Sequence, residues 1–435
     1  MSPILAGVIG MGLFLLLMFL GVPIPFAAGL AGITGVILIM GFKLGLNIIT
    51  TIPFTSAASY SLTVMPLFVL MSEFCFQGGL TTDAYVGARD WFGDKRGGLA
   101  ITSTVASAIF GAVCGAGSTT AMVMTQAAWP EMKRYRYSPK LGLGSIAAAG
   151  PLATLIPPSM PFITYALLAE VSVGQMFNAG WIPGIITCVI LCLTVNIIVR
   201  LRPDYAPRTE KLTFLDRLKS FKRFWAIAVL IVIVFGSMWG GLCTVNEAAG
   251  VGAIGALIIG FAKRRLNWKS ALRCVKNVAV TSVAVYFVLS AMTVFNTFMA
   301  LSGVPRALAA WVADLPLSPM GIMWVIVILY LVLGCFLDAP PILMLTVPLL
   351  APAIRTLGFD LLWFGVIVTM TAAIGSLTPP VGICLFVMRN NVPEVSFGDI
   401  VRGPAPFLLS HFAALVLFLY VPALVTWLPG LLQGK

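Results

Sequence analysis

Two clusters of small and oxygen-bearing residues could bind a cation. One is the run Gly115-Ala116-Gly117-Ser118-Thr119-Thr120, and the other is Asp338 with the adjoining Ala339-Pro340-Pro341. Backbone carbonyl, hydroxyl and carboxylate oxygens are the ligands that hard cations such as Na⁺ prefer. The glycines of the first run also permit backbone angles that other residues avoid. These residue types therefore predict cation binding at two places in the chain.

An apolar helix with a double proline follows each cluster. The first interruption is Ile156-Pro157-Pro158-Ser159, and the second is Thr378-Pro379-Pro380-Val381. Proline has no amide hydrogen, so backbone carbonyl groups at these points lose their helical partners and must find protein, water or a cation. A pair of such breaks at matching places in two halves of a chain is typical of a secondary transporter.

Each cluster also has a purely structural interpretation. Small hydroxyl residues can simply pack membrane helices closely. The carboxylate of Asp338 could cap the following helix, in whose first turn proline is tolerated, or it could cap the helix and bind an ion. Buried acids in membranes are costly and often functional, so both interpretations stay open. Glu247 follows Asn246 at a helix start and is interpreted as a first-turn charge favoured by the helix dipole.

The composition is that of a membrane protein. Of the 435 residues, 60% are hydrophobic and 10% are charged, and the mean hydropathy is +1.02. These values predict an all-α polytopic membrane protein and exclude a soluble protein of this size. The net charge of +12 is concentrated between apolar spans, as in cytoplasmic loops, so no nucleic-acid partner is expected. No H-E-x-x-H, P-loop or G-x-S-x-G sequence is present, which argues against an enzyme.

The basic segments give the topology. Residues 99–130 form two apolar arms of roughly 15 residues each, too short to cross a core of about 30 Å, and basic residues flank both ends. This pattern predicts a re-entrant hairpin from the cytoplasmic side, and the second half repeats it from the periplasmic side as an inverted repeat. The predicted organisation is a first repeat 1–200 with hairpin 99–130 and broken helix 141–170, a basic cytoplasmic loop 201–223, and a second repeat 224–435 with hairpin 320–353, broken helix 361–388 and final span 404–428.

The sequence also predicts a turn in one segment and interfacial helices in two others. The uncharged stretch Ile4–Met40 is too long for one span, so a turn is expected at Gly21-Val22-Pro23. Thr81–Asp94 and Asn267–Asn277 mix polar and aromatic residues and are predicted to be interfacial helices that lie along the membrane.

Several strings together point to a family. They are Gly21-Val22-Pro23-Ile24, Met65-Pro66-Leu67-Phe68, Pro130-Glu131-Met132, Leu155-Ile156-Pro157-Pro158-Ser159, Asn246-Glu247-Ala248-Ala249, Phe336-Leu337-Asp338 and Leu377-Thr378-Pro379-Pro380-Val381-Gly382. In this order, from about residue 4 to residue 428, the chain resembles the large membrane subunit (M subunit) of tripartite ATP-independent periplasmic (TRAP) transporters, in the ion transporter superfamily. The strings are specific as a set and not singly.

This resemblance implies an elevator-type secondary transporter in a bacterial or archaeal inner membrane. A moving transport domain would carry both hairpins and both broken helices, and the other helices would form a scaffold. Na⁺ would be the coupling ion, and membrane lipid would surround the chain. The implied partners are a small four-helix membrane subunit, expected as a separate chain, a periplasmic solute-binding protein, and a small organic acid as the solute.

The resemblance also implies site residues at matching positions. One Na⁺ site would use Gly115, Gly117, Ser118, Pro157 and Ser159, the other would use Asp338, Pro340, Thr378, Pro379 and Val381, and the substrate would contact Ser118, Thr119, Ser159, Asp338 and Thr378. Helix N-termini and hydroxyl groups at the hairpin tips could hold a carboxylate. The sequence departs from the family at Ala372-Ala373-Ile374-Gly375, because relatives often have Glu before this Ile-Gly. The ligands of the second site therefore stay open.

Three rival functions remain at this point. A stand-alone Na⁺-coupled anion carrier would have the same architecture but need no binding protein. A membrane scaffold subunit would not transport at all. An intramembrane enzyme would turn over a substrate without any gradient. Transport assays with and without the binding protein, and with altered hairpin tips, separate these functions.

Overall fold

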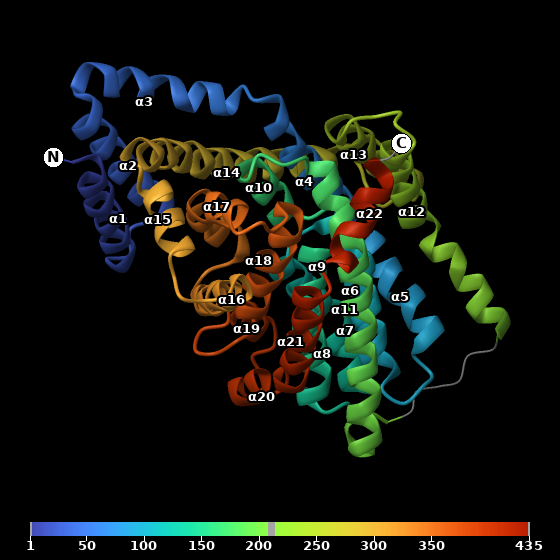
Figure 1. The fold of residues 1–435 in the computed structure, drawn as a ribbon. Helices are drawn as coiled ribbons and strands as arrows, with labels where there is room; N and C mark the ends of the chain where they lie inside the picture. Colours follow the sequence, from blue (N-terminus) through green and yellow to red (C-terminus); the bar gives the residue numbers. More distant parts are fainter. Residues whose placement is uncertain (1, 208–213, 434–435) are drawn as a thin grey trace.

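The computed structural model describes residues 2–207 and 214–433, and the regular structure in these residues is helical (Figure 1). Six of the described helices are long and apolar enough to cross a membrane, or up to eight if each of two bent helix pairs is one span. The prediction of an all-α polytopic membrane protein is therefore confirmed. Proline and glycine set many of the helix ends, because neither favours a continuous helix.

Helices in the first half of the chain include both short arms and one long span. Their bounds are α1 Pro3–Phe19, α2 Ile24–Met40, α3 Phe42–Ala57, η1 Tyr60–Thr63, α4 Val64–Gln77, α5 Leu80–Phe92, α6 Gly98–Cys114, α7 Gly117–Arg134, α8 Pro139–Ala149, α9 Leu152–Leu155, α10 Met160–Leu168, α11 Val173–Leu201 and η2 Pro203–Tyr205. The expected turn at Gly21-Val22-Pro23 lies between α1 and α2.

The second half begins with long helices and ends with short ones. Its helices are α12 Phe214–Trp239, α13 Val245–Ala262, α14 Trp268–Ser302, α15 Val304–Ala313, α16 Pro319–Phe336, α17 Ala339–Thr356, α18 Leu361–Gly375, α19 Ile383–Asn391, α20 Phe397–Arg402, α21 Ala405–Tyr420 and α22 Ala423–Gln433. Glu247 completes a capping box with Thr244 at the start of α13, as expected of a first-turn acid.

The long helix α14 runs across the upper part of the molecule in Figure 1, below α3, with α1 and α2 at one end. A Cβ atom added to Gly32 of α2 would lie 2.8 Å from the backbone nitrogen of Phe295 in α14. A glycine therefore permits close packing of these two helices. The ring centroids of Phe14 in α1 and Phe295 in α14 lie 4.9 Å apart. Helices α1 and α2 therefore both pack against α14 at Phe295.

Two pairs of apolar helices of 17 or 18 residues, joined by tight turns, stand where the hairpins are predicted, and α16 and α17 are each long enough to cross a membrane. Helices α6 and α7 meet at Gly115-Ala116, and helices α16 and α17 meet at Leu337-Asp338. Each hairpin precedes an interrupted helix. The chain bends by 40° between α8–α9 and α10 at the first double proline, and α18 and α19 are separated at the second. The peptide bonds Pro157-Pro158 and Pro379-Pro380 are both cis.

Three segments differ from the sequence predictions. The prediction of a separate interfacial helix at Asn267–Asn277 is wrong. In the structure this segment is continuous with the following span in α14, because no Gly or Pro interrupts the chain there. The basic loop 201–223 is helical from Phe214 onward, and its residues 208–213 lie outside the described part of the chain. The final span is divided at Pro422, since α21 ends at Tyr420 and α22 begins at Ala423.

Ion pairs hold the start of α12 against α5. Arg217 pairs with Asp94, and Arg223 lies 3.2 Å from Asp90. The same Asp90 pairs with Arg89 at 3.0 Å, and Arg89 pairs with Glu131 of α7 at 3.1 Å. Two cations in the first turns of α12 thus have acidic partners in or just after α5.

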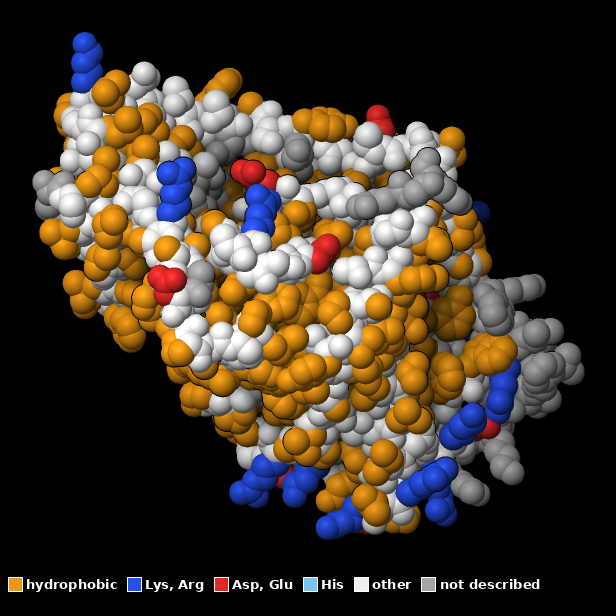
Figure 2. All heavy atoms as spheres, in the orientation of Figure 1, with side chains coloured by type: hydrophobic (Ala, Val, Ile, Leu, Met, Phe, Trp, Pro, Cys, Tyr) orange, Lys and Arg blue, Asp and Glu red, His pale blue; other side chains and the backbone are white. Residues whose placement is uncertain are grey.

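The surface is apolar over the middle of the face shown in Figure 2, and Lys and Arg side chains gather at its lower edge. Exposed apolar side chains on α16 include Val325, Ile328 and Val332, at helical spacing. In water such a stripe would be unfavourable, but it suits contact with lipid.

Candidate functional site

The first hairpin tip contacts the first helix break through backbone atoms. The amide of Met160 donates a hydrogen bond of 3.0 Å to the carbonyl oxygen of Gly115. Gly115 has φ +68°, and a Cβ atom at this position would lie 2.4 Å from the carbonyl oxygen of Pro158. Both the left-handed backbone and the close approach require glycine. The predicted partners, tip one and break one, are therefore adjacent.

Ser159 joins the two sides of the first break. Its side chain is fully buried, and its hydroxyl donates to the Thr154 carbonyl at 2.6 Å while accepting from the Phe162 amide at 3.3 Å. The second bond caps α10, since the hydroxyl accepts from an amide at the start of that helix. Ser159 therefore has a structural role at the position predicted to bind Na⁺ and substrate.

The second tip contacts the second break through the end of α16. The Gly382 amide donates to the Cys335 carbonyl at 3.1 Å, and the Cys335 thiol lies 3.6 Å from the Pro379 carbonyl oxygen. At the residue before Cys335, a Cβ atom added to Gly334 would lie 2.8 Å from the Cα atom of Gly375. The backbones of α16 and α18 therefore touch at Gly334 and Gly375.

The two hairpin tips meet each other at one hydrogen bond. The hydroxyl of Ser118, in the first turn of α7, donates to Oδ2 of Asp338 at 3.2 Å. Oδ1 of the same carboxylate accepts from the Ala339 amide at 2.9 Å and so caps α17. Asp338 is thus a cap in this structure, and its second oxygen faces the other tip.

Four half-helices begin around these tips and breaks, and their caps differ. Side chains cap α10 and α17, whereas no side chain among the described residues caps α7 or α19. The first amide groups of a helix have no intrahelical partner and carry partial positive charge. The uncapped start of α7 can therefore donate to an anion. At α19, by contrast, the Cys384 amide already donates to the Ser376 carbonyl at 3.2 Å and the Leu385 amide to the Gly382 carbonyl at 2.8 Å.

Other predicted residues lie around this centre with different exposure. Thr119 and Pro379 are exposed, Pro157 and Gly117 are buried, and Pro340, Val381 and Thr378 are partly buried. The Thr378 hydroxyl, which lies just beyond the end of α18, donates to the carbonyl of Ile374 in that helix at 3.0 Å. Sequence reasoning missed Gly334 and Cys335, although a glycine at a helix contact is a recognisable signal in membrane proteins.

A polar seam joins the first hairpin to the far end of the second broken helix. Gln126 of α7 donates to Asn391 at 2.8 Å, while the Trp129 indole and the Lys133 ammonium both donate to Glu394, at 3.3 and 3.2 Å. These α7 residues share one helix face. The pKa of Glu394 lies below its ordinary value, because its own backbone amide and then Lys133 and Trp129 stabilise the carboxylate.

The two broken helices also contact each other. The buried hydroxyl of Tyr165 in α10 donates to the Leu361 carbonyl at the start of α18, at 2.6 Å. With the Ser118–Asp338 bond and the polar seam, this contact connects both hairpins and both broken helices through hydrogen bonds. These elements can act as one unit in the protein.

The donor set at the tips suits a hard cation. In the described residues, no cluster of three or more His, Cys, Asp or Glu side chains could hold a metal ion. A cation here would bind carbonyl and hydroxyl oxygens, with Asp338 as the one carboxylate at the meeting point of the tips. Such a set is suited to Na⁺ and unsuited to zinc.

Paired apolar helices with polar tips, each pair followed by an interrupted helix, are typical of a polytopic membrane transport protein. Residues 11–424 match the family model described as "Tripartite ATP-independent periplasmic transporter, DctM component". The chain belongs to this family, as its sequence predicted. Relatives are named as transporter permease proteins, so the chain is a transporter subunit and not an enzyme.

Curated relatives are similar over most of this chain. The isethionate TRAP transporter permease protein of Oleidesulfovibrio alaskensis is 31% identical over 96% of this chain, which spans 66% of that relative's length, less than two thirds. The C4-dicarboxylate TRAP transporter large permease protein of Rhodobacter capsulatus is 30% identical over 97% of this chain and 98% of its own length. The sialic acid TRAP transporter permease protein of Haemophilus influenzae is 31% identical over 96% of this chain and 67% of its own length.

A solved structure supports the fold. The YdaH transporter of Alcanivorax borkumensis superimposes with a TM-score of 0.65, covering 88% of this chain and 89% of that one. The sequence identity is 14%, so the similarity concerns the fold alone.

Proposed function

We propose that this chain is the large permease of a Na⁺-coupled transporter that takes up a small organic acid across a bacterial or archaeal inner membrane. A periplasmic solute-binding protein would deliver the acid, and a small four-helix membrane subunit would complete the complex. Family membership supports these partners. The relatives named for isethionate, C4-dicarboxylates and sialic acid all carry acids, which supports an anionic solute.

The Ser118–Asp338 hydrogen bond is the observation that carries the site proposal. It brings the tips of the two hairpins together, so a solute between them would contact both halves of the chain. The carboxylate of the solute would accept from the free amides at the start of α7 and from the hydroxyl groups of Ser118 and Thr119. Ser159 would position the first break and Thr378 the second, through the hydrogen bonds that their hydroxyl groups donate.

Na⁺ would bind on either side of this solute position. One ion would use oxygens of the Gly115–Ser118 tip and the Pro157–Ser159 break, whose backbones are already in contact. The other would use Asp338 and carbonyl oxygens near Pro379 and Val381. A cation beside Asp338 lowers the electrostatic cost of placing a carboxylate there, so ion and solute would each favour the binding of the other.

Translocation in this proposal is an elevator movement of the hydrogen-bonded unit of hairpins and broken helices. The connections within the unit, Tyr165–Leu361 and Ser118–Asp338, would move together. Helices α1, α2, α4, α13 and α14 would form the scaffold, with α2 closely packed on α14. The polar tips would then exchange sides while the long apolar helices stay in lipid.

Uptake into proteoliposomes tests this function. The full chain and its small subunit are reconstituted, and the periplasmic binding protein is loaded with the radiolabelled acid that co-purifies with it. We expect uptake only with an inward Na⁺ gradient and the loaded binding protein together. Equal uptake without the binding protein would identify a stand-alone carrier, and no uptake under any gradient would contradict the transport proposal.

A further inference from the structure

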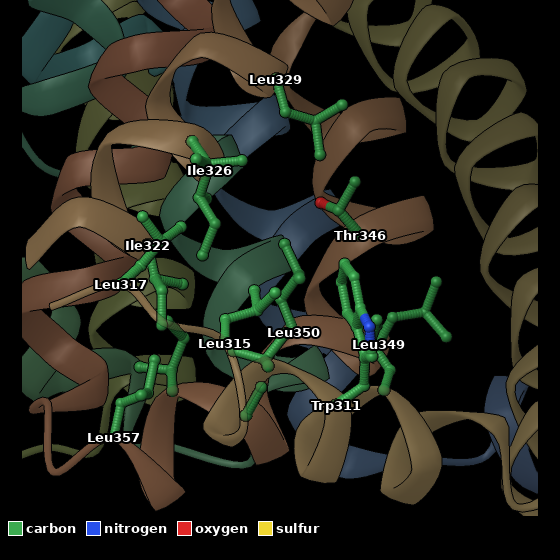
Figure 3. Close-up of a pocket in the computed structure, with 15 residues that line it drawn as sticks. Trp311, Leu315, Leu317, Ile322, Ile326, Leu329, Thr346, Leu349, Leu350 and Leu357 are labelled. Atoms are coloured by element: carbon green, nitrogen blue, oxygen red, sulfur yellow. The ribbon is translucent and has the colours of Figure 1, made fainter. Parts of the chain in front are cut away.

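A separate apolar pocket lies between the short helix α15 and the second hairpin, away from the tips. Its volume is about 470 Å³, within the roughly 300–1,000 Å³ typical of small-molecule sites. Figure 3 shows Trp311, Leu315, Ile326 and Leu350 around it. The pocket takes its walls from α15, α16 and α17.

The chemistry of the pocket excludes a polar ligand. All of its lining side chains are hydrophobic except Thr346 and the indole nitrogen of Trp311. The Thr346 hydroxyl donates to the Ile342 carbonyl at 2.7 Å and also bonds to the Tyr330 hydroxyl, so it is already satisfied. A polar solute would lose its hydrogen bonds to water on entering this pocket. Hydrocarbon is the matching chemistry.

The mouth of the pocket is continuous with the lipid-facing surface of α16. Val325 and Leu329 line the pocket and are 56% and 43% exposed, and they belong to the same outer stripe as Ile328 and Val332. The inner wall is closed, because Ile326 and Ile354 are buried. A lipid chain could therefore pass from the bilayer into the pocket without crossing any polar group.

We propose that this pocket binds one acyl chain of a membrane phospholipid, seated between α15 and the second hairpin. Trp311 is 61% exposed at the rim, and the amphipathic indole favours the level of the membrane interface. Residues of three helices, α15, α16 and α17, line the pocket, which suits a single chain seated between them rather than a packed helix of another subunit. The bound chain fills the space beside α17, the helix that Asp338 caps.

Photolabelling with a defined lipid tests the proposal. The full chain, co-expressed with its small permease subunit, is reconstituted in bilayers of phosphatidylethanolamine and phosphatidylglycerol that contain a phosphatidylethanolamine with a diazirine in mid-chain. Peptide mass spectrometry then locates the adducts. We expect adducts on the pocket-facing residues of α15 and α17 to exceed those on the outer stripe of α16 at least fivefold.

Matched substitutions separate the pocket from the general lipid surface. Leu350→Trp fills the pocket and should lower labelling of its walls at least fivefold, while Ile328→Trp on the outer stripe should leave it unchanged. Ala353→Val, a smaller filling change, should give a partial loss even where Leu350→Trp fails to assemble. Equal labelling of pocket and stripe in the wild type would overturn the proposal. So would unchanged labelling in both filling variants, or adducts that appear only when the small subunit is omitted.

Discussion

The Ser118 hydroxyl and the Asp338 carboxylate form a 3.2 Å hydrogen bond between residues that are 220 positions apart in the chain. Each residue stands at the first turn or cap of a half-helix, α7 or α17. The bond therefore joins the two hairpin tips through one hydroxyl and one carboxylate oxygen. The other carboxylate oxygen stabilises α17 by capping it.

Removing the Ser118 hydroxyl tests whether the two tips act together. Ser118→Ala leaves one oxygen of Asp338 without its partner, and hydrogen bonds to charged groups contribute roughly 1.5–3 kcal/mol. We expect Na⁺-dependent uptake to fall roughly tenfold, measured as initial rate in proteoliposomes. Thr125→Val is the control, since among the described residues that hydroxyl bonds only to the Ala121 carbonyl of its own helix. Equal uptake by wild type and Ser118→Ala would remove Ser118 from the site.

Two substitutions of Asp338 separate its cap from its charge. Asparagine caps helices about as well as aspartate, whereas alanine loses roughly 0.5–2 kcal/mol. Asp338→Asn should therefore keep the thermal stability of the wild type, and Asp338→Ala should lower it. Both should raise the Na⁺ concentration needed for half-maximal uptake about tenfold. A normal Na⁺ dependence in Asp338→Asn would show that the carboxylate is only a cap.

Gly115→Ala tests the contact between the first tip and the first break. The left-handed backbone costs an alanine roughly 1–2 kcal/mol, and its Cβ would also meet the Pro158 carbonyl at 2.4 Å. Gly241→Ala is a matched control, because Gly241 has φ +69° and nothing within 4 Å of the added atom. We expect the temperature of thermal unfolding to fall further in Gly115→Ala than in Gly241→Ala. Uptake should be lost in Gly115→Ala alone. Equal shifts would show that the close approach is unimportant.

The stability that the polar seam contributes should depend on pH, because Glu394 titrates. Its pKa is lower in the folded protein than the ordinary value of 4.5, so its bonds stabilise the fold above about pH 4.5 and are lost as the pH falls through the lowered value. Glu394→Gln should therefore reduce thermal stability slightly at neutral pH, and this difference should shrink in acid. Asp204→Asn, at another exposed acid, is the control. A difference that grew in acid would contradict this assignment.

Much of the architecture could be predicted from local chemistry. Proline in a helix interior removes an amide donor, and the structure has breaks at the double prolines between α9 and α10 and between α18 and α19. The Gly115-Ala116-Gly117 run coincides with the turn between α6 and α7, because glycine permits backbone angles that end a helix. Family membership followed from the order of the strings and is confirmed over residues 11–424.

The remaining features depend on contacts that a local pattern does not contain. Nothing near Ser118 in the sequence specifies Asp338 as its partner. The contact of Gly334 with Gly375 depends on how α16 crosses α18. Helix α14 was wrongly divided at Asn277 because polarity suggested an interface, yet helical hydrogen bonding continues wherever no residue breaks it.

Simultaneous measurement of ²²Na⁺ and labelled acid entry tests the central claim most directly. Proteoliposomes contain the full chain and its small subunit, and the loaded binding protein is added outside. The account predicts that the acid stimulates Na⁺ entry, that the two fluxes keep a fixed ratio, and that Ser118→Ala lowers both fluxes together. Entry of the acid at the full rate without any accompanying Na⁺ entry would contradict it.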